Sequence, residues 1–271
     1  MKVCVSIPVH ECPDVINDQI SNIKAAYGQN VIIVLHRSRQ FRFPDRIYAN
    51  QDYNIFNKDQ VFVNPVSLPT QYHNGLVHVH NANFRYIAAQ TDFDYFVLHA
   101  SNDMYVRKGA QIHMASVKNA CMQTEIHREA SWPWSHAALG DSELQNIMEF
   151  LGITTAYSTQ PEGIFFEKDV FREMVRIIER FFEYGRGYRL PREEIYYSTL
   201  ISKLTDSFSR TPLVLSEVTT GYPIDRDTIL GVHEQKGLQT EAYCIEHVYA
   251  VKRIERNIHH PLRQWIRELM N

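Results

Sequence analysis

Acidic side chains flank a short apolar run in the middle of the chain, and their spacing suggests a site. Asp92 and Asp94 precede the run from Tyr95 to Leu98, and Ser101-Asn102-Asp103 follows it. Asp-x-Asp is the spacing with which sugar-nucleotide enzymes hold a divalent metal ion, whose preferred ligands are carboxylate oxygens. If the run is a strand, the two acidic groups lie at opposite ends of it, so only one group can face a ligand there.

Charged pairs near the end of the chain are further candidates. Glu193 and Glu194 follow Pro191, which suits the first turn of a helix, so both carboxylates are expected near the positive helix end. That position should keep them ionised, and a plain pair of charges at a helix start is the competing interpretation. Lys252 and Arg253 are adjacent, so in a strand their side chains would point to opposite faces unless the strand has already ended.

Aromatic and histidine residues offer weaker signals. Trp134 lies in the stretch SWPWSHAALGD and could stack its indole on a sugar ring of an acceptor, although packing against the core is an equal alternative. His73, His78 and His80 invite a zinc interpretation, because two imidazoles of HVH would share one face of a strand. No acidic or cysteine partner is close in the sequence, so we expect no metal site.

The elements that must position these residues alternate between strands and helices. Apolar runs at 2–10, 30–36, 60–64 and 94–100 are typical of buried strands. Helical spacing follows the first run, and NANFRYIAAQT at 81–91 indicates another helix. This alternation predicts a doubly wound α/β sheet with mostly parallel strands.

In such a sheet, ligands bind beyond the carboxyl ends of the strands. His10, the group His36-Arg37-Ser38, and Ser101-Asn102-Asp103 each follow a predicted strand. Asp92 and Asp94 precede theirs, so we expect them in a solvated loop at the opposite edge. Asp103 is therefore the acidic group expected to face a ligand, with a turn that bonds its own backbone as the alternative.

The second half of the chain continues in the same style. Residues 162–185 indicate a strand and then an amphipathic helix, and residues 190–204 indicate another helix. The stretch HVYAVKRI is strand-like, and a helix is expected after Pro261. No repeat or linker interrupts the 271 residues, which favours one domain.

Composition limits the class of protein. The formal net charge is -3 with no long basic run, which argues against nucleic acid as a partner. The cysteines at 4, 12, 121 and 244 form no Cys-x-x-Cys pair and are typical of reduced, mostly buried thiols. Met1-Lys2 leads directly into a strand-like run without a signal peptide pattern, and no apolar stretch is long enough for a transmembrane segment. We expect a soluble, cytoplasmic protein.

The order of these segments resembles one family. VSIPVHECPDVINDQISNI, VIIVLHRS, YFVLHASNDMYVRKG, PREEIYYSTL and a late VKR are similar to motifs of the core-2/I-branching N-acetylglucosaminyltransferases and peptide xylosyltransferases. The resemblance spans most of the chain, and it depends on the order and spacing of the motifs. It implies a GT-A type fold in one glycosyltransferase domain over 1–271, with a nucleotide-binding half at 1–110 and an acceptor and catalytic half at 111–271.

The resemblance also implies roles for single residues. Aligning Tyr197-Ser198-Thr199 with the family places its catalytic base at Glu194, whereas Pro191, one residue further away than the family's proline, leaves Glu193 as the alternative. His10 matches a histidine near the nucleotide.

Further matches concern the donor. Arg37 and Ser38 match the end of the second motif, where Leu35 replaces the family's aspartate, and Lys252 and Arg253 match a basic pair that replaces a metal ion at the diphosphate.

The implied activity is an inverting, metal-independent transfer. A UDP-sugar, carrying N-acetylglucosamine or xylose, would donate its sugar to a hydroxyl of a glycan or glycoconjugate acceptor, with no cofactor. Two alternatives stay open at this point: a metal-dependent transferase in which Asp92 and Asp94 hold manganese, and a non-catalytic sugar-binding protein on the same fold.

Overall fold

The computed structural model describes residues 1–10, 12–37, 56–68, 75–130, 132–181, 190–216, 224–236 and 244–271. Its main sheet contains the four strands expected from the first hundred residues, which are β1 (Val3–Val9), β2 (Val31–Arg37), β3 (Val61–Asn64) and β4 (Tyr95–Leu98). They pair in parallel in the order β3-β2-β1-β4, and β8 (Phe165–Glu167) adds to β4 in the antiparallel direction. The predicted α/β class with a mostly parallel sheet is confirmed.

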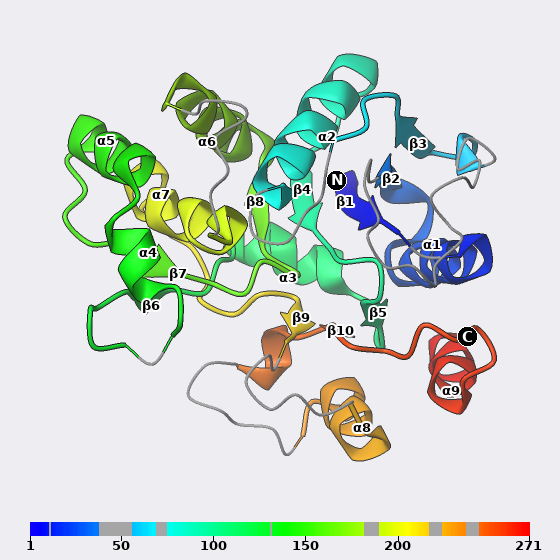
Figure 1. The fold of residues 1–271 in the computed structure, drawn as a ribbon. Coiled ribbons are helices and arrows are strands. Elements are labelled where there is room, and N and C mark those ends of the chain that lie inside the picture. The colour runs from blue at the N-terminus through cyan, green and yellow to red at the C-terminus, as the bar shows by residue number, and fades with distance from the viewer. Residues whose placement is uncertain are drawn as a thin grey trace, which may run out of the picture.

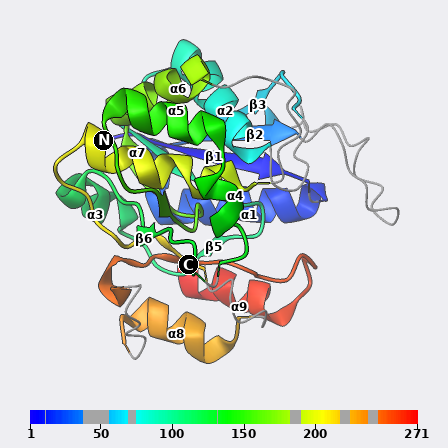
Figure 2. The same ribbon diagram turned by 60° about the vertical axis from the view of Figure 1, so that its left-hand side comes forward.

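Helices cover both faces of this sheet (Figures 1 and 2). Alternate strand residues point to opposite faces, so Val5 and Ile33 join one apolar cluster and Cys4 and Ile32 join the other. The first cluster includes α1 (Pro13–Tyr27). The second includes residues of α2 (Leu76–Gln90), α5 (Ser142–Leu151), α6 (Lys168–Phe181) and α7 (Tyr196–Leu204).

A smaller sheet lies below the main one in Figure 1. It consists of β5 (Met104–Tyr105), β10 (Ala250–Val251) and β9 (Val214–Leu215), in that order. The helices α3 (Ala110–Val117), α8 (Arg226–Glu234) and α9 (Pro261–Met270) add apolar residues to the first cluster. Because β5 follows β4 after a short turn, this sheet places β10 beside the carboxyl edge of the main sheet.

The remaining described elements are short. β6 (Thr124–Glu125) and β7 (Tyr157–Ser158) form an antiparallel pair, and α4 (Ser135–Leu139) precedes α5. Single 3-10 turns occur at η1 (Gly28–Asn30), η4 (Arg192–Glu194) and η5 (Ile245–His247).

The helix expected over 190–204 is present: it begins as the 3-10 turn η4 and continues as the α-helix α7 from Tyr196. One prediction about local structure is wrong. His78 and His80 lie on α2, which begins at Leu76, and not on a strand. The β-branched valines of LVHVH favour a strand locally, but their burial against the main sheet is compatible with a helix.

Two further observations concern the cysteines and the helices. Cys4 and Cys121 are buried as expected, whereas Cys12 is half-buried and Cys244 exposed, and all four are free. No helix in the described part of the chain has the length and apolar content needed to span a membrane.

Candidate active site

Asp103 lies in the turn that follows β4, at the carboxyl edge of the sheet, where the sequence predicted it. Its carboxylate is fully buried and accepts a hydrogen bond from the backbone N–H of Ala100 at 2.8 Å. The imidazole of His99 lies 3.3 Å from the same oxygen. Gln19 of α1 donates to the carbonyl oxygens of Ala100 and Asp103 at 2.7 and 3.0 Å, so α1 holds the backbone of this turn in place.

Glu162 reaches the same edge from the opposite chain direction. Because β8 is antiparallel to β4, the residues before β8 lie beside the end of β4, and the Gly163 N–H donates to the Leu98 carbonyl at 2.7 Å. Gly163 has a φ of 79°, and a Cβ there would lie 2.3 Å from the Val214 nitrogen. Only glycine fits this turn, which places the Glu162 carboxylate at the carboxyl edge.

Arg192 anchors the turn that carries the glutamates Glu193 and Glu194. Its guanidinium is fully buried and forms ion pairs with Asp141 at 3.0 Å and Glu143 at 2.9 Å, two residues at the start of α5. A buried guanidinium has lost its hydration, so its charge needs such carboxylate partners. The turn is therefore held from α5, and the charges of its two glutamates interact with those of Glu162 and Lys252.

Lys252 completes the group directly after β10. The strand ends at Val251, so the second of the two sequence alternatives for the basic pair holds. The Lys252 ammonium lies 2.5 Å from a carboxylate oxygen of Glu162, and its backbone N–H donates to Leu215 at 3.0 Å. We call Asp103, Glu162, Glu193, Glu194 and Lys252 the carboxyl-edge cluster.

The charges of this cluster influence one another strongly. Burial raises the pKa of Glu193 from 4.5 to about 7, and the Glu162 charge adds to the rise. Burial, Glu193 and Glu162 raise the pKa of Glu194 from 4.5 to about 8, with Lys252 opposing. Burial alone would lower the pKa of Lys252, but Glu162, Asp103 and Glu194 outweigh it and raise this pKa.

These shifts correct one sequence expectation and show a further property of the cluster. The positive end of a helix was expected to keep Glu194 ionised, but burial among other carboxylates favours its protonated form. In the described residues, Oδ1 of Asp103, Oε2 of Glu162 and Oε2 of Glu193 are buried without a hydrogen-bond partner. Buried polar atoms without a partner are uncommon in folded proteins, so these oxygens mark the cluster as a candidate site.

The other residues expected to bind the donor lie at or near the same edge. Nε2 of His10, directly after β1, lies 3.2 Å from the Arg256 guanidinium, four residues beyond Lys252. Arg37 is the exposed last residue of β2 and pairs in register with Val9. Arg253 has a φ of 68°, so the chain turns sharply after Lys252.

The remaining expected contacts have different surroundings. Ser101 is buried and Asn102 is half-buried in the turn before Asp103. Ser38 and His73 lie outside the described residues. Trp134 precedes α4 and packs, partly buried, against the apolar cluster that contains α5 and α7.

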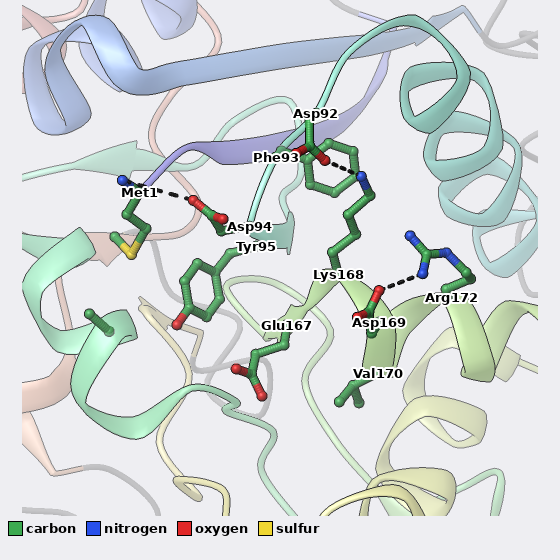
Figure 3. A pocket seen from close by; sticks show the side chains of 11 residues that line it. Met1, Asp92, Phe93, Asp94, Tyr95, Glu167, Lys168, Asp169, Val170 and Arg172 are labelled. Atoms are coloured by element: carbon green, nitrogen blue, oxygen red, sulfur yellow. Dashed lines mark hydrogen bonds and ion pairs between the residues drawn. The ribbon is translucent and has the colours of Figure 1, made fainter.

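Asp92 and Asp94 lie at the amino edge, as predicted. They line a cavity of about 760 Å³ with Glu167, Lys168 and other residues. Figure 3 shows Asp92 pointing to the Lys168 ammonium, which lowers the pKa of Asp92. Asp94 accepts from the backbone N–H of Lys2 at 2.6 Å. Both carboxylates thus have positive or N–H partners, and the full length of β4 separates them from Asp103.

The two histidines of α2 lie in different surroundings. His80 is buried and its Nδ1 lies 2.9 Å from the Ser6 hydroxyl, and burial lowers its pKa to about 3. His78 lies two residues away on the helix, so it faces a different side. Within the described ranges, no three His, Cys, Asp or Glu side chains are arranged to hold a metal ion.

Sequence reasoning missed three residues of this region. Glu162 precedes a strand, and in a parallel sheet this position would lie at the amino edge, away from the site. The turn sequence Pro161-Glu162-Gly163 was the one sequence signal of an unusual backbone conformation there. Arg192 was overlooked between Pro191 and the glutamates. Arg256 follows the basic pair and gave no signal of its contact with His10.

Comparisons with known proteins leave the function open. No model of a known protein family matches the chain, and no curated protein matches it. Similar solved structures include S. aureus TarS in complex with UDP-GlcNAc, with 9% identity and a TM-score of 0.36 over 64% of this chain and 47% of that chain. The chain thus spans about half the length of that TarS structure.

Two other similar structures cover nearly all of this chain. The apo-form glycosyltransferase GlyE of Streptococcus pneumoniae TIGR4 has 9% identity and a TM-score of 0.39, covering 100% of this chain and 60% of that chain. An active-site mutant of LgtC has 6% identity and a TM-score of 0.43, covering 98% and 94%. Similarity this low carries no information about substrate or mechanism.

Proposed function

We propose that this protein is an inverting glycosyltransferase with a GT-A type fold that uses no divalent metal ion. It transfers N-acetylglucosamine or xylose from a UDP-sugar to a hydroxyl of a glycan or glycoconjugate acceptor. One observation carries the proposal: at the carboxyl edge of a doubly wound sheet, the charges of Glu193, Glu194 and Lys252 lie close enough to shift one another's pKa values. The motif resemblance supports the choice of reaction, and the cytoplasmic location stays a prediction.

Glu194 is the proposed catalytic base. Its carboxylate is half-buried and has a pKa of about 8, close to the pH at which a general base transfers protons efficiently. The acceptor hydroxyl gives its proton to Glu194 while its oxygen bonds to the anomeric carbon. The bond from that carbon to the diphosphate oxygen breaks on the opposite face, and UDP leaves with the electron pair. Glu193, more deeply buried, is the alternative base.

The leaving diphosphate needs positive charge. Lys252 and Arg253 supply it in this proposal, in the place of a metal ion. His10, Arg37 and the turn Ser101-Asn102-Asp103 contact the rest of the donor, and Trp134 contacts the acceptor. The transition state has the oxocarbenium character of glycoside chemistry.

Replacing the base tests the assignment. Glu194→Gln should abolish UDP release from a panel of UDP-sugars and acceptors, while donor binding measured by thermal shift persists. Glu167→Gln is the matched control, since Glu167 lies at the opposite edge of the sheet. Full transfer by the Glu194→Gln variant refutes the role, and loss of transfer only in Glu193→Gln assigns the base to Glu193.

The metal-dependent alternative makes a different prediction. It requires Asp92 and Asp94 to hold manganese, but both have partners at the amino edge. We expect activity to survive a chelator. Activity that disappears in chelator and returns with manganese contradicts the metal-independent mechanism.

A further inference from the structure

The ion pair between Glu162 and Lys252 has no part in the reaction described so far. The two charged atoms are 2.5 Å apart, and their side chains are 12% and 20% exposed. The pair thus lies mostly out of water, where a charge-assisted hydrogen bond is strong. It involves the same ammonium that the proposed function assigns to the diphosphate.

The backbones on both sides of the pair are fixed. The Gly163 turn is held by its hydrogen bond to Leu98 and leaves no room for a side chain. Lys252 is held by its backbone bond to Leu215. Rotation of the two side chains is therefore enough to open the pair, and neither chain segment has to break its backbone hydrogen bond.

The surroundings of Lys252 are strongly acidic. Asp103 comes from the turn after β4, Glu162 from the turn before β8, and Glu194 from η4, with Glu193 next to it. The imidazole of His99 lies 3.3 Å from the Asp103 carboxylate. A diphosphate entering this cluster must therefore compete with carboxylates for the ammonium.

We propose that Glu162 is a positioning residue that holds Lys252 in the unliganded protein and releases it when a nucleoside diphosphate binds. This inference rests on the proposed function, because it uses the diphosphate as the ligand. On binding, the Lys252 ammonium rotates from the Glu162 carboxylate to a phosphate oxygen, and no covalent bond changes. The role of Glu162 is therefore to keep a buried ammonium paired until the donor arrives.

Titration calorimetry with UDP tests the inference. Glu162→Gln removes the competing charge, so UDP should bind about tenfold tighter, the size expected for a charge-assisted hydrogen bond that no longer has to be broken. Inorganic pyrophosphate should show the same gain and uridine none. Asp92→Asn is the matched control, because it breaks an acid–lysine pair at the opposite edge and should leave UDP binding unchanged.

A double-mutant cycle with Lys252→Met separates release of the lysine from simple repulsion between Glu162 and phosphate. In the Lys252→Met background, Glu162→Gln should no longer increase the affinity for UDP. A gain that persists without Lys252, or unchanged UDP affinity in Glu162→Gln, overturns the inference but leaves the proposed function standing. Absence of UDP binding in the unaltered protein overturns both. If Glu162→Gln does not fold, Glu162→Asp, with a shorter reach to Lys252, should show a smaller gain in the same direction.

Discussion

Burial of Glu193 makes the stability of the protein depend on pH in a specific way. Its pKa is raised from 4.5 to about 7 in the folded state, chiefly by burial, so the folded protein binds the proton more tightly than the unfolded chain does. The stabilisation is complete below the unfolded pKa and is lost as the pH rises through about 7. Glu193→Gln carries no titrating group and lacks this loss.

The size of the effect follows from the shift. At about 1.4 kcal/mol per pKa unit, the shift corresponds to about 3 kcal/mol in total. Between about pH 5 and about pH 8.5, about 2.5 kcal/mol of it should be lost in the unaltered protein. Removal of the Glu193 charge also lowers the pKa of Glu194. The stability of Glu193→Gln therefore depends still less on pH than that of the unaltered protein.

Urea unfolding at both pH values measures this difference. The quantity compared is the change in unfolding free energy between the two pH values, so any fixed effect of the substitution on packing cancels. We expect a change at least about 2 kcal/mol smaller in Glu193→Gln than in the unaltered protein. Glu268→Gln, at an exposed residue of α9, is the control and should retain the full pH dependence. Equal pH dependence in Glu193→Gln and the unaltered protein would refute the raised pKa.

Three further predictions concern the same region. Under the proposed function, the rate of sugar transfer should rise with pH through about 8, because Glu194 as the proposed base must lose its proton. A profile that is flat from about pH 6 to about pH 9 would contradict this. Gly163→Ala should lower the unfolding free energy by more than about 2 kcal/mol, because φ is positive there and the new Cβ would lie too close to the Val214 nitrogen. Gly28→Ala is the control and should lower the unfolding free energy less, because the space around Gly28 is open. Equal urea midpoints of the two variants would contradict this prediction. Arg192→Met should lower it by about 3–5 kcal/mol because two carboxylates lose their buried cation, and an unchanged melting temperature would show that the pairs do not stabilise the fold.

The sequence determined the frame and the side of the sheet on which the candidate site lies. Continuous apolar runs alternating with helical spacing predict parallel strands, and in parallel strands the residue order alone assigns each flanking group to an edge. This is why the sequence alone places Asp103 at the carboxyl edge and Asp92 and Asp94 at the other. Local pattern also predicted the strand before α6 and the helix after Pro261.

Only the tertiary structure decided which charges meet and in which protonation state. The direction of β8 is not encoded in its own residues, and reversal of that strand brings Glu162 to the end of β4. The pairing of Glu162 with Lys252 joins residues 90 positions apart in the chain, through two different sheets. The raised pKa values of Glu193 and Glu194 depend on burial by distant segments, because a carboxylate loses its hydration only when other parts of the chain surround it.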